Sequence, residues 1–201
     1  MAKISNPLPP LPPGSEQIAA WAPRCRLHYE PHPDEAWFRA WEPFDTMVSA
    51  SAYFNAVSWA LAPSIFTIAE PWLAPVDSEP LDRTLLGFAG HPALQRWASA
   101  RGGDHFNTRV AYIENPPPPR VELGDPRWDR FMATFAASPA EASAAIPIGV
   151  RRKLAEWTFR GHLELRPGGL VLHFAGFRPV PADYERLYRG LPELVASFFG
   201  P

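Results

Sequence analysis

Proline sets the main limit on how this chain can fold. The 201 residues include 26 prolines, about two and a half times the usual share of roughly 5%. Because proline fixes φ and lacks a backbone donor, the sequence excludes long uninterrupted helices and predicts short elements joined by stiff turns. Hydrophobic residues make up 46% of the chain and charged residues 20%, an ordinary globular composition that excludes wholesale disorder.

Residues 1–14 form a proline-rich arm. Residues 6–14 read NPLPPLPPG, and successive prolines leave polyproline II as the regular conformation available to them. The run contains the PxxP spacing that aromatic grooves recognise. The arm is therefore either a ligand for a protein partner or a stiff surface tail. Its candidate docking residues are Pro9, Pro10, Pro12 and Pro13.

A second proline run suggests a boundary further along the chain. Residues 116–119 are four consecutive prolines, which cannot lie inside a sheet. We expect a rigid spacer there between an aromatic-rich N-terminal half, residues 15–115, and a C-terminal half, residues 120–201. One continuous domain over residues 15–201 is the alternative.

The C-terminal half carries the clearest pattern. Residues 162–166 and 170–174 flank a Pro-Gly-Gly turn and alternate between apolar and polar side chains, which predicts a β-hairpin. One face of this hairpin holds the leucines. The other holds His162, Glu164, Arg166 and His173, and we expect that face to be solvated, with an anion or metal site as the alternative.

The order of elements predicts the fold class. A strand at 128–136, a helix from Ser138, the hairpin and a last helix from Pro181 follow one another. This order is typical of an α+β fold in which short helices pack on one face of an antiparallel sheet. Further helices are predicted at 15–22, 33–41 and 91–101, and further strands at 83–89 and 106–114.

Residues 46–69 are 24 consecutive residues without a charge. This length admits a membrane span, so a membrane-associated accessory protein anchored through residues 46–69 is an alternative. The polar residues within the run, the acidic flanks and Pro63 favour buried strands that are split at Pro63 instead.

Three tryptophans of the N-terminal half, Trp21, Trp37 and Trp41, are candidate docking residues. Trp37 and Trp41 are four residues apart and therefore share one face of the predicted helix 33–41. Such a pair packs either in the core or against a partner chain. Core packing is the commoner outcome, since exposed apolar patches are exceptions in monomers.

Residues 25–32 read CRLHYEPH, which spaces Cys25, His28 and His32 as three potential zinc ligands. A catalytic zinc ion needs three protein ligands and an open position, so a small metal-dependent enzyme is an alternative function. Pro31 and Pro33 prevent a helix from aligning the two histidines. A solvated loop with one buried cysteine is the favoured interpretation, and no other cofactor is indicated.

Signs of other catalytic sites are weak. Asp104 and His105 follow a glycine pair, where a base and its orienting carboxylate could lie, but no nucleophile motif accompanies them. The chain contains no GxSxG, Walker, GxGxxG, HExxH or CxxC motif. An enzyme is therefore less well supported than a binding protein.

The remaining composition bears on partners and location. A net charge of −2 lacks the strongly basic footprint of a nucleic-acid-binding domain. The one cysteine forbids an intramolecular disulfide, and no signal-like apolar run opens the sequence, so we expect a cytoplasmic location. The aromatic residues and the arm together favour a non-enzymatic protein-binding or accessory subunit of a larger complex.

Overall fold

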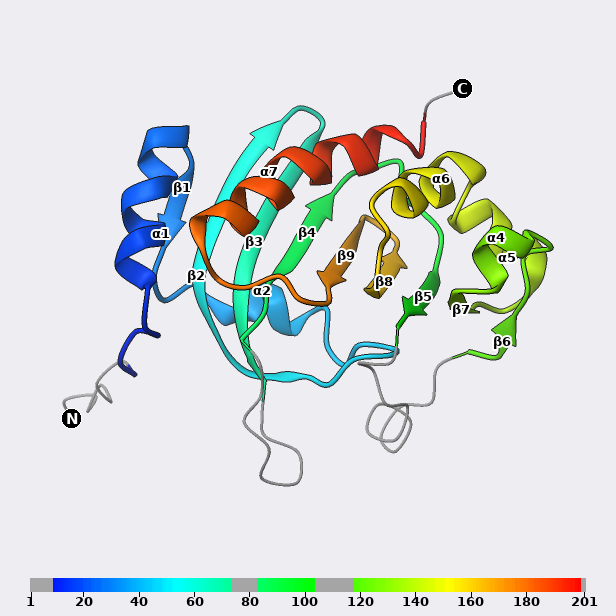
Figure 1. Ribbon diagram of the computed structural model, residues 1–201, viewed down its shortest axis with the longest axis horizontal. Coiled ribbons are helices and arrows are strands. Elements are labelled where there is room, and N and C mark those ends of the chain that lie inside the picture. Colours follow the sequence, from blue (N-terminus) through cyan, green and yellow to red (C-terminus); the bar gives the residue numbers. More distant parts are fainter. Residues whose placement is uncertain (1–8, 74–82, 104–117, 200–201) are drawn as a thin grey trace, which may run out of the picture.

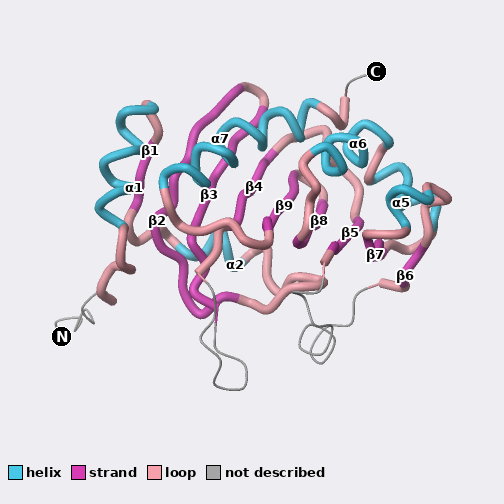
Figure 2. The backbone as a smooth tube through the Cα atoms, in the orientation of Figure 1, coloured by secondary structure: helices cyan, strands magenta, loops and turns pink. Residues whose placement is uncertain are grey.

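The structure is a computed structural model that describes residues 9–73, 83–103 and 118–199. Its strands form one nine-stranded sheet in the order β1-β2-β3-β4-β9-β8-β5-β7-β6, and all neighbouring strands are antiparallel (Figure 1). Short helices cover this sheet (Figure 2). The predicted α+β class with an antiparallel sheet is therefore confirmed.

The elements have the following bounds. The strands are β1 (His28–Glu30), β2 (Ala50–Leu61), β3 (Ser64–Leu73), β4 (Leu86–Gly90), β5 (Ala98–Gly102), β6 (Arg120–Val121), β7 (Met132–Phe135), β8 (Gly161–Arg166) and β9 (Gly169–Phe174). The helices are α1 (Ser15–Trp21), the 3-10 helix η1 (Ala22–Cys25), α2 (Glu35–Arg39), α4 (Pro126–Asp129), α5 (Pro139–Ala145), α6 (Ile148–Glu156) and α7 (Pro181–Ala196).

The uncharged run at 46–69 forms most of the hairpin of β2 and β3, as the split at Pro63 predicts. Val57 from β2 and Phe66 and Ile68 from β3 are buried in the core. None of the helices in the described ranges is long and apolar enough to cross a membrane.

Strands from both sides of the proline run 116–119 share the sheet. β4 pairs with β9, and β5 pairs with both β7 and β8. Every one of these pairs joins the N-terminal half to the C-terminal half. The strands of the two halves therefore complete one another's hydrogen bonding.

Two hydrophobic clusters lie on opposite faces of the sheet. Along β9, Leu170 and Leu172 belong to the larger cluster and Val171 belongs to the smaller one, because successive strand side chains point to opposite faces. We call the side of the larger cluster the α7 face, which α1, α4, α5, α6 and α7 cover. The other side is the α2 face, which α2 and residues 40–49 cover.

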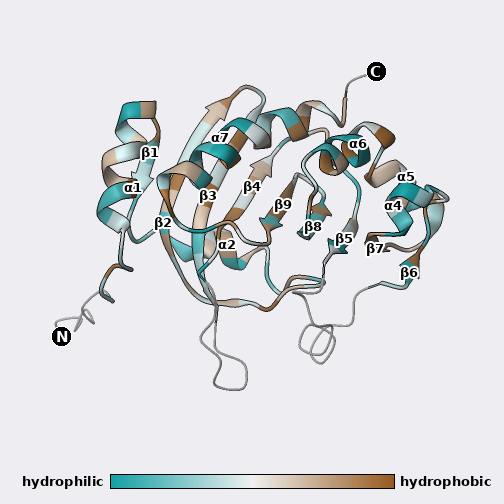
Figure 3. Cartoon of the chain, in the orientation of Figure 1, coloured by the Kyte–Doolittle hydropathy of each residue, from teal (hydrophilic) through white to brown (hydrophobic). Residues whose placement is uncertain are grey.

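Helices thus lie on both faces, and the expectation that they pack on one face is wrong for α2. Its apolar side chain Phe38 is buried against Phe88 and Val171, which point away from α7. On the other side, α7 turns its apolar stripe to the sheet and its charged residues to solvent (Figure 3). Gly87 allows this close approach, since a Cβ there would lie 2.9 Å from Leu191 Cδ1.

The structure confirms some of the other predicted elements and contradicts others. The hairpin of β8 and β9 is confirmed, with the left-handed Gly168 in its turn. The helix predicted at 91–101 is wrong, because residues 98–102 form β5, which pairs with β7 on one side and β8 on the other and buries Ala98 and Ala100 in the larger cluster. The last helix runs unbroken through Pro192. The strand predicted at 106–114 lies outside the described residues.

Candidate functional site

Helix α2 and the turn that follows it present two tryptophans beside the sheet, Trp37 and Trp41. The Asp34 carboxylate accepts a hydrogen bond from the Ala36 amide at 3.0 Å and so caps the first turn. Phe38 stacks on Tyr53 with ring centroids 4.6 Å apart and fixes the inner side of the helix. Trp37 meets Phe88 edge-on at 5.1 Å, yet 44% of its surface stays exposed.

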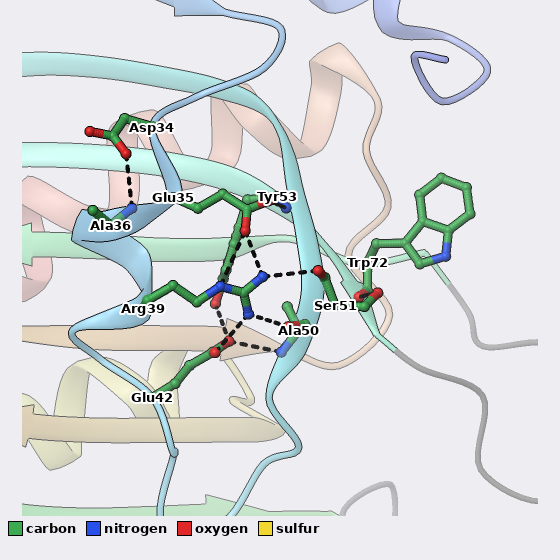
Figure 4. Close-up of polar contacts among 9 residues, drawn as sticks. All are labelled: Asp34, Glu35, Ala36, Arg39, Glu42, Ala50, Ser51, Tyr53 and Trp72. Atoms are coloured by element: carbon green, nitrogen blue, oxygen red, sulfur yellow. Dashed lines mark hydrogen bonds and ion pairs between the residues drawn. The ribbon is translucent and has the colours of Figure 1, made fainter. Parts of the chain in front are cut away.

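An arginine fastens α2 to the sheet (Figure 4). Arg39 donates to Glu35 at 2.6 Å, to Glu42 at 2.8 Å and to the Ser51 carbonyl at 2.9 Å. A further bond from Arg39 reaches the Ala50 carbonyl. Both carboxylates also accept bonds from β2, so the helix and the strand form one charge-assisted network.

Tyr53 of β2 also takes part in this network. Its hydroxyl donates to Glu42 Oε1 at 2.7 Å, while burial, followed by the hydrogen bond and charge of Glu42, raises the pKa of Tyr53. The phenol therefore remains a donor at neutral pH. Glu42 is satisfied by Arg39, Tyr53 and the Ala50 amide together.

The sheet beside the tryptophans is apolar and partly open. Ile65 of β3, Gly90 of β4 and Gly169 of β9 are cross-strand neighbours and form one row across the sheet. Because two of the three are glycines, few side chains cover the backbone of this row between Ile65 and Trp41. A Cβ on Gly169 would come within 3.3 Å of the Trp41 ring, which places the ring directly over the row. Ile65 itself is 61% exposed.

Ala60 lies opposite Ile65 on β2 and is also exposed. Both residues alternate with side chains of the larger cluster and so face the α2 side. We call the surface made by Trp37, Trp41, Ala60 and Ile65 the Trp37 face. Arg166 extends its edge, with its guanidinium carbon 5.8 Å from the Trp41 ring centroid.

Trp21 does not belong to this surface. It lies in the core under α7, 6% exposed, with its ring 5.8 Å from Tyr184. Of the three candidate docking tryptophans, the structure therefore brings Trp37 and Trp41 together and places Trp21 elsewhere.

The last prolines before α1, Pro12 and Pro13, are tied to the domain. The Ser15 hydroxyl donates to the Pro12 carbonyl at 2.7 Å, and Arg83 donates to the Pro13 carbonyl at 2.6 Å. Pro12 is buried, whereas Pro9, Pro10 and Pro13 are exposed. The Ser15 side chain thus fixes Pro12. The N-terminal cap of α1 is Gly14, whose backbone is left-handed.

A buried asparagine anchors these contacts. Asn55 sits at a positive φ of 51° in β2. Its amide donates to Ser15 Oγ at 2.9 Å and to Glu70 Oε2 at 2.8 Å, and its carbonyl side-chain oxygen accepts from Tyr29 at 2.8 Å. All of its polar atoms are used internally, which is the signature of a structural role.

The polar face of the β8–β9 hairpin is buried, so the expectation that it is solvated is wrong. His162 and Glu164 are both 0% exposed. Residues 40–49 cover them: the Asp45 amide donates to Glu164 at 2.8 Å, and Thr46 Oγ1 is hydrogen-bonded to His162 Nδ1 at 2.5 Å. Arg166 donates to Glu164 at 2.6 Å from the rim.

The pKa values of the two carboxyl groups in this cluster, Asp45 and Glu164, are shifted in opposite directions. Burial, reinforced by the nearby charge of Glu164, raises the pKa of Asp45 to about 6. Burial also acts to raise the pKa of Glu164, but hydrogen bonding and positive charge from His162 and Arg166 outweigh it and lower that pKa. The cluster is closed to substrates, since Asp45 is buried as well, and it ties the covering loop to the sheet.

The three potential zinc ligands are not assembled. Cys25 packs beside the larger cluster, while His28 and Glu30 point outward from β1 and are hydrogen-bonded to each other at 2.9 Å. His32 packs edge-on against Phe54. Within the described ranges, no group of three or more His, Cys, Asp or Glu side chains is arranged to hold a metal ion. Asp104 and His105 lie outside those ranges.

Sequence reasoning missed two parts of the Trp37 face. Nothing in the uncharged run singles out Ala60 or Ile65, since their exposure depends on where α2 stops covering the sheet. The Arg39 network could have been found, because Glu35, Arg39 and Glu42 have the i,i+4 and i,i+3 spacing of helical ion pairs.

The described residues define an antiparallel α+β protein with an open apolar surface, the Trp37 face. Among solved structures, the crystal structure of the mycobacterial trehalose monomycolate transport factor A, TtfA, is similar, with a TM-score of 0.54 over 92% of this chain and 97% of that chain at 11% identity. This likeness shows a shared fold. No family model and no curated protein matches the sequence.

Proposed function

We propose that this protein is a non-enzymatic protein-binding subunit that docks a partner on the Trp37 face. The observation that carries the proposal is the exposure of Trp37 and Ile65, 44% and 61%, on the same side of the sheet. Tryptophan is enriched among the residues that dominate binding energies at protein interfaces.

The rigidity of the surface supports this proposal. Trp37 lies on α2 and Trp41 in the turn after it, and Arg39 and Tyr53 join this segment to β2. Ile65 lies on a strand that is paired on both sides. A surface that is ordered before binding loses little conformational entropy in the complex. An apolar centre with a charged rim, here Arg166, is also the usual arrangement of a protein interface.

The arm supplies a second contact in this proposal. Pro9 and Pro10 are exposed and precede the anchored Pro12, so the polyproline segment starts from a fixed point on the domain. A stiff ligand of this kind binds an aromatic groove at low entropic cost.

Site-specific photo-crosslinking tests the proposal. A benzoylphenylalanine residue replaces Trp37 or Ile65 in cells of the source organism, and Arg152, an exposed residue of α6, serves as the control position. We expect one protein to be cross-linked from positions 37 and 65 and not from 152. The double variant Trp37→Ser/Ile65→Ser should lower recovery of that protein about tenfold or more, as expected for the loss of central interface anchors.

Two matched variants complete the experiment. Trp97→Ser removes a tryptophan that is exposed elsewhere and should leave recovery unchanged. Removal of residues 1–11 keeps the anchored Pro12 and Pro13 and should weaken recovery without changing the thermal transition. The proposal is rejected if positions 37 and 65 yield no cross-linked protein, or if Trp97→Ser lowers recovery as much as the double variant does.

A further inference from the structure

A pocket of about 860 Å³ lies on the other side of the molecule from the Trp37 face. It is formed where β5 ends and β7 begins, between α4, the end of α6 and the residues that lead into β8. Figure 1 shows these helices gathered over the end of the sheet that holds β5, β6 and β7. The volume falls within the range of roughly 300 to 1,000 Å³ that is usual for small-molecule sites.

The inner wall of the pocket is apolar. Trp128, Met132, Leu154 and Phe159 are buried side chains that line it. The indole nitrogen of Trp128 donates to Thr134 Oγ1 at 2.8 Å, so its polar group is already satisfied and the ring offers only apolar surface. Phe131 adds a ring at the mouth that is 67% exposed.

The rim of the pocket is cationic. Its charged lining residues are Arg127, Arg130 and Arg160, and no aspartate or glutamate is among the described residues that line it. All three arginines are exposed. Among the described residues, no carboxylate contacts their guanidinium groups, although the Arg127 backbone amide donates to the Asp125 carboxylate at 3.2 Å. The Arg130 guanidinium instead lies over the Phe131 ring, with its central carbon 5.4 Å from the centroid.

Several other arginines of the chain are ion-paired. Arg39, Arg83, Arg151 and Arg166 each pair with a carboxylate of the fold. Three arginines whose guanidinium groups have no carboxylate partner among the described residues, around one apolar pocket, leave positive charge that a bound anion would neutralise, and guanidinium groups suit carboxylates and phosphates in particular.

We propose that this pocket binds an amphipathic anion, with an apolar body against Trp128, Met132 and Phe159 and a carboxylate or phosphate group held by Arg127, Arg130 and Arg160. The apolar wall excludes a purely ionic ligand such as inorganic phosphate as the preferred occupant. The arginine rim likewise excludes cationic and neutral amphiphiles. This site is independent of the protein-docking surface proposed above, because the two share no residue.

Calorimetric titration of the full-length protein tests the assignment with a matched series of probes. The probes are dodecanoate and dodecyl phosphate, each below its micelle concentration, with dodecyltrimethylammonium, dodecanol and inorganic phosphate as controls. We expect one or both of the anionic amphiphiles to bind with one-to-one stoichiometry and the controls to bind at least tenfold more weakly. The tighter of the two anions identifies the head group.

Variants locate the binding. Arg130→Gln/Arg160→Gln should weaken the anion about tenfold, since the loss of roughly 1.4 kcal/mol of binding free energy is tenfold in affinity. Arg152→Gln removes an exposed arginine of α6 that does not line the pocket and should bind as the wild type does. The replaced arginines are exposed, so the variants should keep the wild-type thermal transition.

Three results would overturn the proposal. One is that neither anionic amphiphile binds the wild-type protein. Another is that dodecyltrimethylammonium or dodecanol binds as tightly as the anions, which would indicate unspecific adsorption. The third is that Arg130→Gln/Arg160→Gln keeps full affinity, since the arginine rim would then play no part.

Discussion

Asp45 is a carboxyl group buried against a second carboxyl group. Its backbone amide donates a hydrogen bond to Glu164. The groups that act on its side chain are Glu164, His162, Arg166 and Ser99. Burial and the charge of Glu164 both favour the protonated form of Asp45. The positive charge of Arg166 is instead committed to Glu164, which it contacts directly.

The contribution of Asp45 to the stability of the folded protein should therefore increase as the pH falls from 7 to 5. A pKa raised to about 6 in the folded state means that the folded state binds the proton more tightly than the unfolded chain does. The gain is about 1 kcal/mol over this interval. Asp45→Asn cannot gain this stability, because asparagine does not titrate. In urea denaturation, the free energy of unfolding of Asp45→Asn, relative to that of the wild type, should therefore fall by this amount between pH 7 and pH 5.

The comparison isolates Asp45 because the other titrating groups are present in both proteins. Glu164 has a lowered pKa, so the stability it contributes is lost only at lower pH, as the pH falls through that value. Glu141→Gln, at a half-exposed surface pair, is the control and should show no such change. A stability difference for Asp45→Asn that is independent of pH would contradict the assigned pKa.

At this scale, alternation along the sequence predicts which side chains share a face but not what covers them. His162 and Glu164 do lie together, as expected from the spacing in the hairpin. Their burial depends on residues 40–49, more than a hundred positions earlier in the chain. No local pattern reports such a contact, so the polar face was expected to be solvated.

Polar contacts largely hold α2 in its place on the sheet. It has five residues, Glu35–Arg39, too few to be stable as an isolated helix. Phe38 supplies its apolar contact, and Arg39 supplies bonds to two carboxylates and two carbonyl groups. The position of Trp37 and Trp41 therefore depends on Arg39.

Arg39→Gln should lower the free energy of unfolding by about 2 kcal/mol, since hydrogen bonds to charged groups contribute roughly 1.5 to 3 kcal/mol. Urea denaturation followed by circular dichroism measures this loss. Arg189→Gln is the matched control, because Arg189 makes one exposed i,i+4 pair with Glu185, which should contribute less than about 1 kcal/mol. Equal losses in the two variants would show that Arg39 does not hold α2.

The elements differ in how far their own sequence predicts them. The β8–β9 hairpin is predictable because its turn glycines and its alternation agree. Residues 98–102 form a strand although Ala98, Ala100 and Arg101 also suit a helix, since pairing with β7 and β8 and the burial of Ala98 and Ala100 in the larger cluster override that preference. Pro192 remains inside α7 because leucines on either side of it, Leu191 and Leu194, are buried.

For the whole molecule, the proline run at 116–119 suggests a boundary, but the sheet continues across it. β8 and β9 would each lose a neighbouring strand without β5 and β4. The larger cluster likewise combines Val57 and Phe66 from the N-terminal half with Leu163 and Leu172 from the C-terminal half. Spacing along the sequence could not reveal this arrangement, because strand order is a property of the assembled sheet.

The chain should therefore unfold in one cooperative step. Urea transitions followed by far-ultraviolet circular dichroism and by tryptophan fluorescence should coincide, because a shared core and shared strand pairs leave neither half stable alone. A fragment of residues 120–201 should show no cooperative transition, since β8 and β9 would expose unpaired edges and the leucines of the larger cluster would lose their partners. Two separate transitions in the full chain, or a cooperatively folded fragment, would instead show that the proline run divides two independent domains.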